Sequence, residues 1–209
     1  MSPATSPAGS GPYSAFEGTR RLAAGPLDVV VAAAKAAFDT SRTSLVLIFD
    51  DATGEQIDAD YSGTPAEVLR GVSAREARRT APPAEPEPAT PRGPGRPRLG
   101  VVPREVTLLP RHWQWLNSQP GGASVALRRL VDEARRASVG RDRVRRAQEV
   151  SYRVMTALAG DLPGFEDALR ALFARDGAAF DRHVAAWPGD VRDYARRLAS
   201  PALEDEEGR

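Results

Sequence analysis

The spacing of apolar residues near the start of the chain predicts a strand, a helix, a hairpin and a second helix. Residues 15–24 have the composition of a strand, which a Gly-Pro pair ends. Apolar side chains then recur at helical spacing: Leu27, Val30, Val31, Ala34 and Phe38. Residues 44–49 are expected to form a buried strand, and residues 55–61 alternate apolar and polar positions as a half-exposed strand does. These patterns predict a small α/β unit over residues 13–72.

The second helix of this unit carries a start signal. Thr64 is expected to cap the helix, Pro65 to occupy its first position and Glu67 to close a capping box. A turn of Asp and Gly residues at 50–54 separates the two strands of the predicted hairpin.

Two stretches have compositions that favour disorder. Residues 1–12 are rich in Ser, Pro, Ala and Gly, and residues 73–100 form a linker in which the segment 81–100 holds seven prolines and few apolar residues. The second half of the linker is basic, and its Gly95-Arg96-Pro97 resembles the core of an AT-hook, an element that lies in the minor groove of A/T-rich DNA. A flexible basic tether is the alternative interpretation.

Residues 101–138 have the pattern of a strand followed by two helices. Residues 101–109 have strand composition, and Pro110 is expected to start a helix that continues through Asn117. The segment 120–122 stops that helix, and Ser124 is expected to cap the next one. The apolar stripe of that second helix consists of Leu127, Leu130, Val131 and Ala134.

The rest of the chain predicts a helical bundle over residues 139–200. Four helical stripes are separated by turn signals at 160–163, 176–177 and 188–189. Their members are Ala147, Val150, Ser151, Val154 and Leu158; Phe165, Leu169, Leu172 and Phe173; Phe180 and Val184; and Val191, Tyr194 and Leu198. Residues 201–209 form an acidic tail. The predicted class is α+β.

Composition limits the chemistry that the chain can perform. It has no cysteine, 41% of its residues are hydrophobic and its longest apolar runs are too short to span a membrane, so a cytoplasmic location is expected. The net charge is only +1, yet 28 of the 29 basic residues are arginine. Residues 92–146 contain thirteen arginines and four acidic residues, which gives this segment a net charge of +9.

No motif for catalysis, a cofactor or a metal is found in this sequence. His112 and His183 are the only histidines, and neither has a partner at the spacing of a metal site or a catalytic triad. Four acidic residues flank the predicted hairpin, but their spacing matches no calcium-binding loop: Asp50, Asp51, Asp58 and Asp60. We therefore expect a protein that is not an enzyme.

The strand and two helices resemble the ribbon-helix-helix family of DNA-binding proteins. The resemblance rests on the segment 106–110, Trp113, Leu116, the Gly121-Gly122 turn, Ser124 and the segment 127–134. It implies an intertwined dimer whose paired strands enter the major groove. One strand parity turns Pro103, Glu105 and Thr107 outward; the other exposes Arg104 with Val106 and Leu108.

Three further segments resemble an uncharacterised family of bacterial proteins when taken in their order along the chain. They are the stretch from Gly95 to Gly100, Leu-Leu-Pro-Arg-His-Trp at 108–113 and Gly-Asp-Leu-Pro-Gly-Phe at 160–165. This second resemblance implies no activity, but it indicates that the parts of the chain occur together.

These observations predict a homodimeric DNA-binding protein that regulates transcription. The residues expected to contact DNA are Arg92, Arg96, Arg98, Arg104, Thr107, Ser124 and Arg128. Two alternatives remain open. One is an antitoxin-like regulator that binds a toxin protein, and the other is a scaffold in which the strand and helices serve only for dimerisation.

Overall fold

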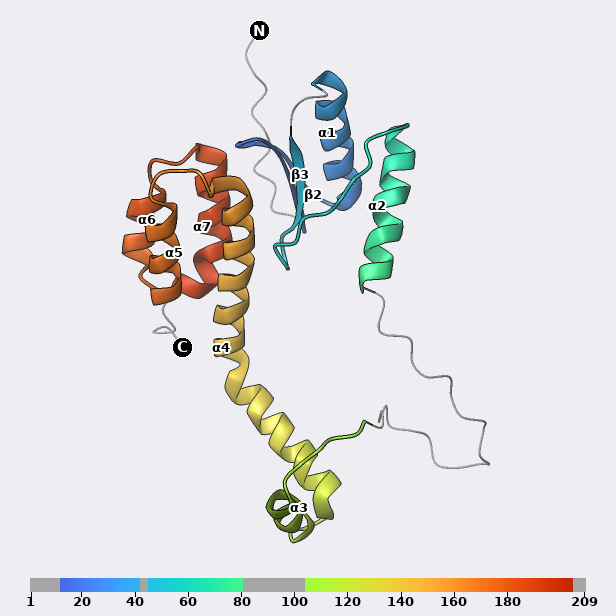
Figure 1. Ribbon diagram of the computed structural model, residues 1–209, viewed down its shortest axis with the longest axis vertical. Helices are drawn as coiled ribbons and strands as arrows, with labels where there is room; N and C mark the ends of the chain where they lie inside the picture. The colour runs from blue at the N-terminus through green and yellow to red at the C-terminus, as the bar shows by residue number, and fades with distance from the viewer. Residues whose placement is uncertain (1–11, 42–44, 81–103, 205–209) are drawn as a thin grey trace. The chain divides into compact units, whose positions relative to one another are not determined.

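The computed structural model describes residues 12–41, 45–80 and 104–204, and Figure 1 shows their arrangement. The strands of these ranges are β1 (Tyr13–Glu17), β2 (Arg20–Gly25) and β3 (Val46–Asp50). The helices are α1 (Leu27–Thr40), α2 (Pro65–Thr80), α3 (Pro110–Asn117), α4 (Gly122–Ala159), α5 (Phe165–Ala174), α6 (Gly177–Val184) and α7 (Gly189–Leu203). The class is α+β, as the sequence predicts.

The described residues divide into two compact units, and the division differs from the predicted one. Residues 12–80 and 141–204 belong to a first unit, whereas residues 104–140 belong to a second. The α/β unit at 13–72 and the bundle at 139–200 were expected to be separate, but they share one unit. Helix α4 is continuous across the predicted boundary at 138, because no proline or cap interrupts residues 122–159.

The predicted strand over residues 15–24 is instead a hairpin. Gly18 adopts a positive φ of 56°, which allows the chain to reverse between β1 and β2. The sheet order is β2-β1-β3, and β1 is antiparallel to both neighbours. The turn lies within the run of polar and glycine residues from Glu17 to Arg21, which separates the apolar ends of the stretch and which the prediction of a single strand overlooked.

Both faces of the sheet are buried. Alternate residues of a strand point to opposite sides, so each strand contributes side chains to two different cores. Ala15 and Ile48, which are paired across β1 and β3, face α1 and α2 and belong to a core with Val30, Val31 and Val72. Phe16 and Phe49 point the other way, into a second core that is shared with the bundle. Side chains that lie far apart in the sequence therefore form a single fold of three layers.

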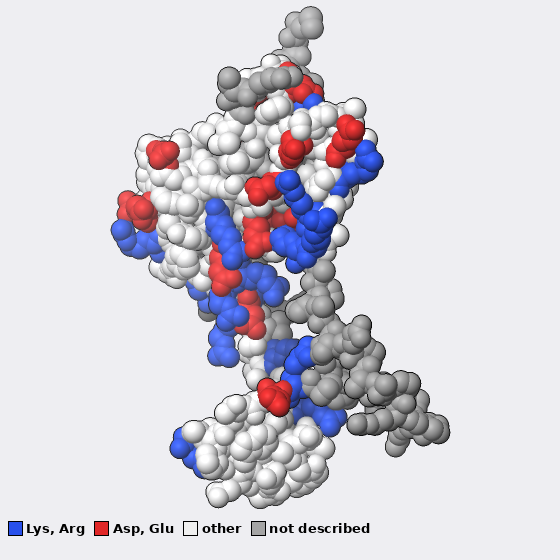
Figure 2. All heavy atoms as spheres, turned by 45° about the vertical axis from the view of Figure 1, so that its right-hand side comes forward, with Lys and Arg blue, Asp and Glu red and all other residues white. Residues whose placement is uncertain are grey.

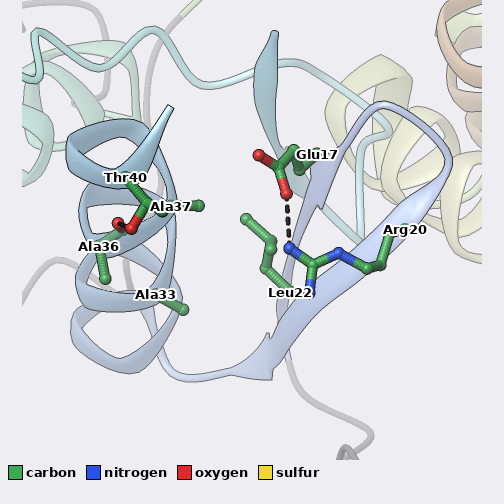
Figure 3. Close-up of a pocket in the computed structure, with 7 residues that line it drawn as sticks. All are labelled: Glu17, Arg20, Leu22, Ala33, Ala36, Ala37 and Thr40. Atoms are coloured by element: carbon green, nitrogen blue, oxygen red, sulfur yellow. Dashed lines mark hydrogen bonds and ion pairs between the residues drawn. The ribbon is translucent and has the colours of Figure 1, made fainter. Parts of the chain in front are cut away.

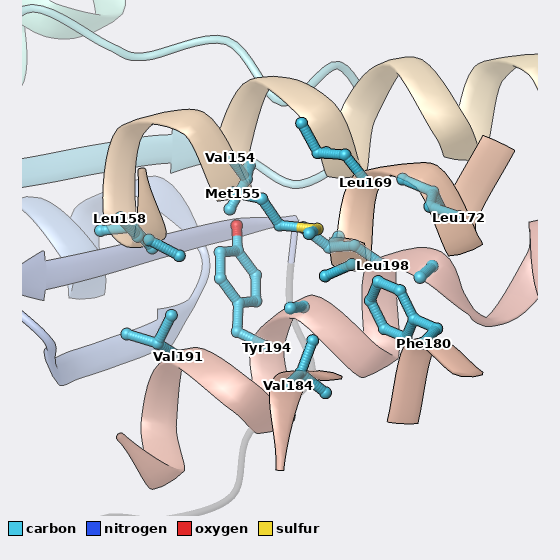
Figure 4. Packing of buried hydrophobic residues seen from close by; sticks show 14 of the residues in the cluster. Val154, Met155, Leu158, Leu169, Leu172, Phe180, Val184, Val191, Tyr194 and Leu198 are labelled. Atoms are coloured by element: carbon cyan, nitrogen blue, oxygen red, sulfur yellow. The ribbon is translucent and has the colours of Figure 1, made fainter. Parts of the chain in front are cut away.

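Helices α4 to α7 supply most of the second core. Figure 4 shows side chains from the four helices converging on one interior: Val154, Met155, Leu158, Leu169, Leu172, Phe180, Val184, Val191, Tyr194 and Leu198. The Tyr194 ring lies 5.0 Å from the Phe16 ring and 6.3 Å from the Phe49 ring, centroid to centroid. This aromatic contact joins the bundle to the sheet. Phe173 was expected in a buried stripe, but it is 54% exposed.

A buried polar cluster fastens the same two layers together. The carboxylate of Asp51, at the end of β3, accepts hydrogen bonds from the Tyr194 hydroxyl at 2.6 Å and from Ser14 at 3.2 Å. The guanidinium of Arg197 donates to the same carboxylate at 2.6 Å and lies over the Tyr194 ring. We call these four residues the Asp51 cluster. Because the Asp51 side chain is only 7% exposed, each of these bonds replaces a lost contact with water.

The half-exposed strand predicted over residues 55–61 is absent from the sheet. Only a single bridge forms there, between Gln56 and Phe49. The preceding turn packs tightly instead, since a Cβ placed on Gly54 would lie 2.7 Å from the Val150 carbonyl oxygen. The turn is thus docked on α4, and Arg153 adds a hydrogen bond to the Thr53 carbonyl at 2.7 Å.

The capping box at the start of α2 is confirmed. The Thr64 backbone N–H donates to the Glu67 carboxylate at 2.7 Å, and the Glu67 N–H donates to the Thr64 hydroxyl at 3.4 Å. These hydrogen bonds, the backbone one foremost, lower the pKa of the Glu67 carboxyl.

Helix α2 continues to Thr80, past the predicted end of the unit at residue 72. Its last turn is held by Arg79, which forms ion pairs with Asp50 at 3.1 Å, with Glu76 at 2.6 Å and with Glu55. The prediction that residues 81–100 are disordered lies outside the described residues, as does that for 1–11. Helix α7 likewise includes the first three residues of the predicted acidic tail, 201–203.

The half-buried Tyr61 and the buried Tyr194 predict a loss of stability in alkaline solution. Burial raises the pKa of Tyr61 to about 12, and burial followed by the Asp51 carboxylate raises the pKa of Tyr194. An unfolded tyrosine ionises near pH 10, so above that pH the unfolded state loses a proton that the folded state keeps. We expect the urea midpoint to fall steadily as the pH rises from about 10 toward 12, and Tyr61→Phe to make that fall shallower. If the urea midpoint of Tyr61→Phe fell as steeply with pH as that of wild type, Tyr61 would not be a source of the alkaline loss of stability.

No helix in the described ranges is both long and apolar enough to cross a membrane.

Candidate nucleic-acid interface

The second unit begins with an extended segment, residues 104–109, which was predicted to be part of a strand. The segment forms no strand, so the prediction was wrong for these residues, and the reason is physical. A strand needs a neighbour with which to exchange backbone hydrogen bonds, and the described part of this chain offers none. Arg104 and Thr107 are both exposed here, and Leu108 is half-buried.

Helix α3 follows the sequence prediction in full. Pro110 occupies its first turn, where a missing N–H costs nothing, and the helix ends at Asn117. Gly121 and Gly122 then adopt positive φ values of 83° and 75°, which β-carbon-bearing residues rarely do. Helix α4 starts at Gly122, so Ser124 lies in its first turn and is not the N-cap that was predicted.

The second unit has a small interior and a large apolar exterior. Of the 31 buried apolar residues in the described chain, only Leu116 and Ala126 belong to it. Yet eight of the twelve exposed large apolar residues lie in it: Val106, Leu109, Trp113, Trp115, Val125, Leu130, Val131 and Val139. In the view of Figure 2 the surface around α3 is almost free of charged side chains. Single chains rarely leave so much apolar surface in contact with water.

A groove between α3 and α4 gathers part of this surface. It has a volume of about 260 Å³, and its lining residues are Leu108, His112, Trp115, Leu116, Leu127 and Leu130. Trp113 and Trp115 are both exposed in the single chain, by 36% and 49%. We call this groove, together with the exposed Val131 beside it, the apolar face of the second unit.

Arginines occupy the opposite side of α4. All ten residues from 128 to 137 are exposed, so no other described element covers this part of the helix. Arg128, Arg129, Arg135 and Arg136 lie there, and none forms an ion pair with another described residue. The Nε–H groups of Arg128 and Arg136 donate to carbonyls one turn earlier, those of Ser124 at 3.1 Å and Asp132 at 3.2 Å. Each guanidinium therefore keeps donors for a ligand.

The structure brings some of the predicted DNA-binding residues together and leaves others undescribed. Ser124 and Arg128 are one helical turn apart on α4, in the same unit as Arg104 and Thr107, and all four are exposed. Arg92, Arg96 and Arg98 lie outside the described residues.

Two features of the interface were missed from sequence. The apolar groove could not be predicted, because the distance of Trp115 and His112 from Leu127 and Leu130 depends on the turn between the two helices. The continuity of α4 was also missed, although the absence of any proline and of any glycine other than Gly140 between residues 123 and 159 is a signal for it.

A second hollow lies in the first unit, between α1 and the edge strand β2. It has a volume of about 290 Å³ and is shown in Figure 3 with its lining residues Glu17, Arg20, Leu22, Ala33, Ala36, Ala37 and Thr40. The only charged groups there, Glu17 and Arg20, bind each other at 2.5 Å. The hollow therefore presents no free charged group to a ligand.

The acidic residues near the turn are committed to the fold. Asp50 pairs with Arg79, Asp51 lies in the Asp51 cluster and Asp60 accepts a hydrogen bond from the Ser62 hydroxyl at 2.6 Å. Among the described residues no group of three or more His, Cys, Asp or Glu side chains is arranged to hold a metal ion.

Comparison with protein-family models finds one match, over residues 12–199, to a family described as "Uncharacterized protein conserved in bacteria (DUF2239)". The chain belongs to this family. The DUF2239 match spans residues of both units, which agrees with the resemblance seen in three separated segments of the sequence. Neither the curated proteins nor the solved structures contain a match. The description of DUF2239 names no activity, so function has to be argued from the second unit itself.

Proposed function

We propose that this DUF2239 protein is a homodimeric, non-enzymatic DNA-binding protein that regulates transcription. One observation carries the proposal: within the second unit, α4 has an apolar face on one side and, on the other, four arginines that form no ion pair with a described residue. The first side suits a protein partner and the second a polyanion.

Dimerisation follows from the apolar face. A unit with two buried apolar residues cannot offset the entropy of ordering its chain, so a partner has to complete its core. A second copy is the simplest partner, because a twofold axis lets the extended segments 104–109 pair with each other in an antiparallel ribbon. With Thr107 directed outward, such a ribbon would also bury Val106, which is exposed in the single chain and points to the opposite face.

DNA binding would rest on phosphate contacts. Arg104 and Arg128 are exposed cations, and Ser124 lies in the first turn of α4, where free backbone N–H groups and the helix dipole favour an anion. Thr107 is exposed and suits a thymine methyl group. Arg92, Arg96 and Arg98 add charge through the linker, and Arg96 is placed for a minor-groove contact by the AT-hook resemblance.

A salt titration of DNA binding by the full chain tests this proposal. We expect affinity for a mixed duplex to fall steeply with salt, since each neutralised phosphate contributes about 0.9 to the log-log slope. Changing Arg92, Arg96 and Arg98 together to Gln is expected to lower the slope by about 2.7 per chain, or about 5.4 for the dimer, if all three bind phosphate. A wild-type protein that failed to retard any duplex at low salt would remove the DNA-binding proposal.

The groove beside α3 supports a second candidate function. Its walls are apolar except for His112, which suits a protein ligand better than a nucleic acid. An antitoxin-like or scaffold protein would use this groove without binding DNA. Formation of a dimer together with an absence of DNA binding would favour that function.

A further inference from the structure

We infer that helix α4 of the second unit enters the major groove of B-form DNA, with Asp132 contacting base edges and arginines on both flanks contacting phosphates. The inference rests on the proposed function, and it names the contacting element as α4 and not a ribbon of residues 104–109.

The pattern around Asp132 is the first support. The residues three and four positions before and after it are all arginine: Arg128, Arg129, Arg135 and Arg136. Residues at these separations are neighbours on a helix surface. Asp132 thus stands on the midline of a face that has one column of arginines on each side. No ion pair joins Asp132 to these arginines among the described residues, so its carboxylate remains open to a ligand.

The midline continues in both directions with apolar residues. Val125 and Val139 lie seven residues before and after Asp132, close to two full turns, and so share its line along the helix. Their side chains are 49% and 63% exposed, although valine gains nothing from contact with water. In the major groove an apolar side chain packs against the thymine methyl group, and a carboxylate accepts a hydrogen bond from the cytosine amino group.

The fit of the helix to the groove is the second support. A helix with its side chains is about 10–12 Å across, and the major groove of B-DNA is about 12 Å wide. Insertion requires that the contacting face of the helix is uncovered, and the residues of this face from 128 to 136 are all exposed. Phosphates line both edges of the groove, as the arginine columns line both edges of this face.

The occupant is duplex DNA because other nucleic acids do not match the face. The deep, narrow major groove of an RNA duplex does not admit side chains. Single strands are held by stacking on aromatic rings, and this face carries none, since the aromatic residues of the second unit are the tryptophans of α3. The apolar face lies on the opposite side of α4, so a second copy bound there leaves Asp132 free.

The test is selection of bound duplexes from a pool of random sequence by the full chain, followed by salt titration on the selected duplex. We expect wild type to enrich a site with an invariant cytosine. Asp132→Asn is expected to keep the salt slope while its preference for that cytosine falls about tenfold. Arg129→Gln with Arg136→Gln is expected to lower the slope by about 1.8 per chain, or about 3.6 for the dimer. The matched control, Arg170→Gln with Arg182→Gln, removes two exposed arginines of the first unit and should leave the slope unchanged.

The outcomes separate this inference from the proposed function. If Asp132→Asn selects the same sequences as wild type, or if no sequence is enriched, α4 does not contact bases. The same conclusion follows if Arg129→Gln with Arg136→Gln leaves the salt slope unchanged, or if single-stranded DNA competes for the protein better than duplex DNA does. In each of these cases DNA binding itself stands. Both ideas fail together only if wild type binds no nucleic acid. The five substituted residues are all exposed: Arg129, Asp132, Arg136, Arg170 and Arg182. Circular dichroism of each variant checks that the fold is kept.

Discussion

Replacing Asp51 with Ala is expected to destabilise the protein by about 3 kcal/mol. Its carboxylate is the common acceptor for Ser14, Tyr194 and Arg197, which come from β1 and α7. Removal leaves the Tyr194 hydroxyl and a half-buried guanidinium without their acceptor, and a buried donor without a partner costs more than an average hydrogen bond provides. Since the cluster joins the sheet to the bundle, the effect should reach both layers of the first unit.

Urea unfolding followed by circular dichroism measures this effect. The control is Asp193→Ala on α7, which removes a carboxylate that is exposed and bound to its neighbour Arg192, and should cost less than about 1 kcal/mol. In a double-mutant cycle, Tyr194→Phe should cost less in the Asp51→Ala background than in wild type. Additive costs would show that the hydroxyl and the carboxylate do not depend on each other.

Replacing Leu130 with Glu is expected to prevent dimerisation and weaken DNA binding. Leu130 lines the apolar groove and is 37% exposed in the single chain. A twofold interface would bury the new charge twice, so the dissociation constant of the dimer should rise at least about a hundredfold. A monomer presents half the arginines to one duplex, so the salt slope should fall as well.

Light scattering and sedimentation across a micromolar range measure the change in mass. The matched control is Val29→Glu, which places the same charge on an exposed valine of α1 in the first unit and should leave the mass unchanged. If wild type stayed monomeric at these concentrations with its helical content intact, the proposed dimer would be wrong. The apolar face would then be the binding surface for another partner.

Several elements were predictable from sequence because their causes are local. Pro110, Asn117 and the Gly121-Gly122 turn fix the ends of α3 through backbone restrictions that act within a few residues. The capping box at Thr64 and Glu67 is equally local. The arginine-rich side of α4 needs only helical periodicity, so its residues could be named before the structure was seen.

Other features depend on contacts between distant residues. No local signal says that Phe16 and Phe49 face Tyr194, or that the acceptor for Tyr194 and Arg197 is Asp51, more than 140 positions away in sequence. The hairpin at Gly18 was missed because strand composition is the same on both sides of a tight turn. The extended segment 104–109 shows the opposite case, since the pattern of a strand is local but its hydrogen-bonding partner is not.

The sequence by itself determined the bounds of α3, the capping box of α2, the α+β class and the concentration of arginine in the middle of the chain. Only the tertiary structure decided that the first and last thirds share one unit and that the apolar side of the second unit is left uncovered. The reason is physical: helix ends and faces follow from backbone conformation and periodicity within a few turns. Burial depends on which distant surfaces meet, and a pattern of apolar residues does not name its partner.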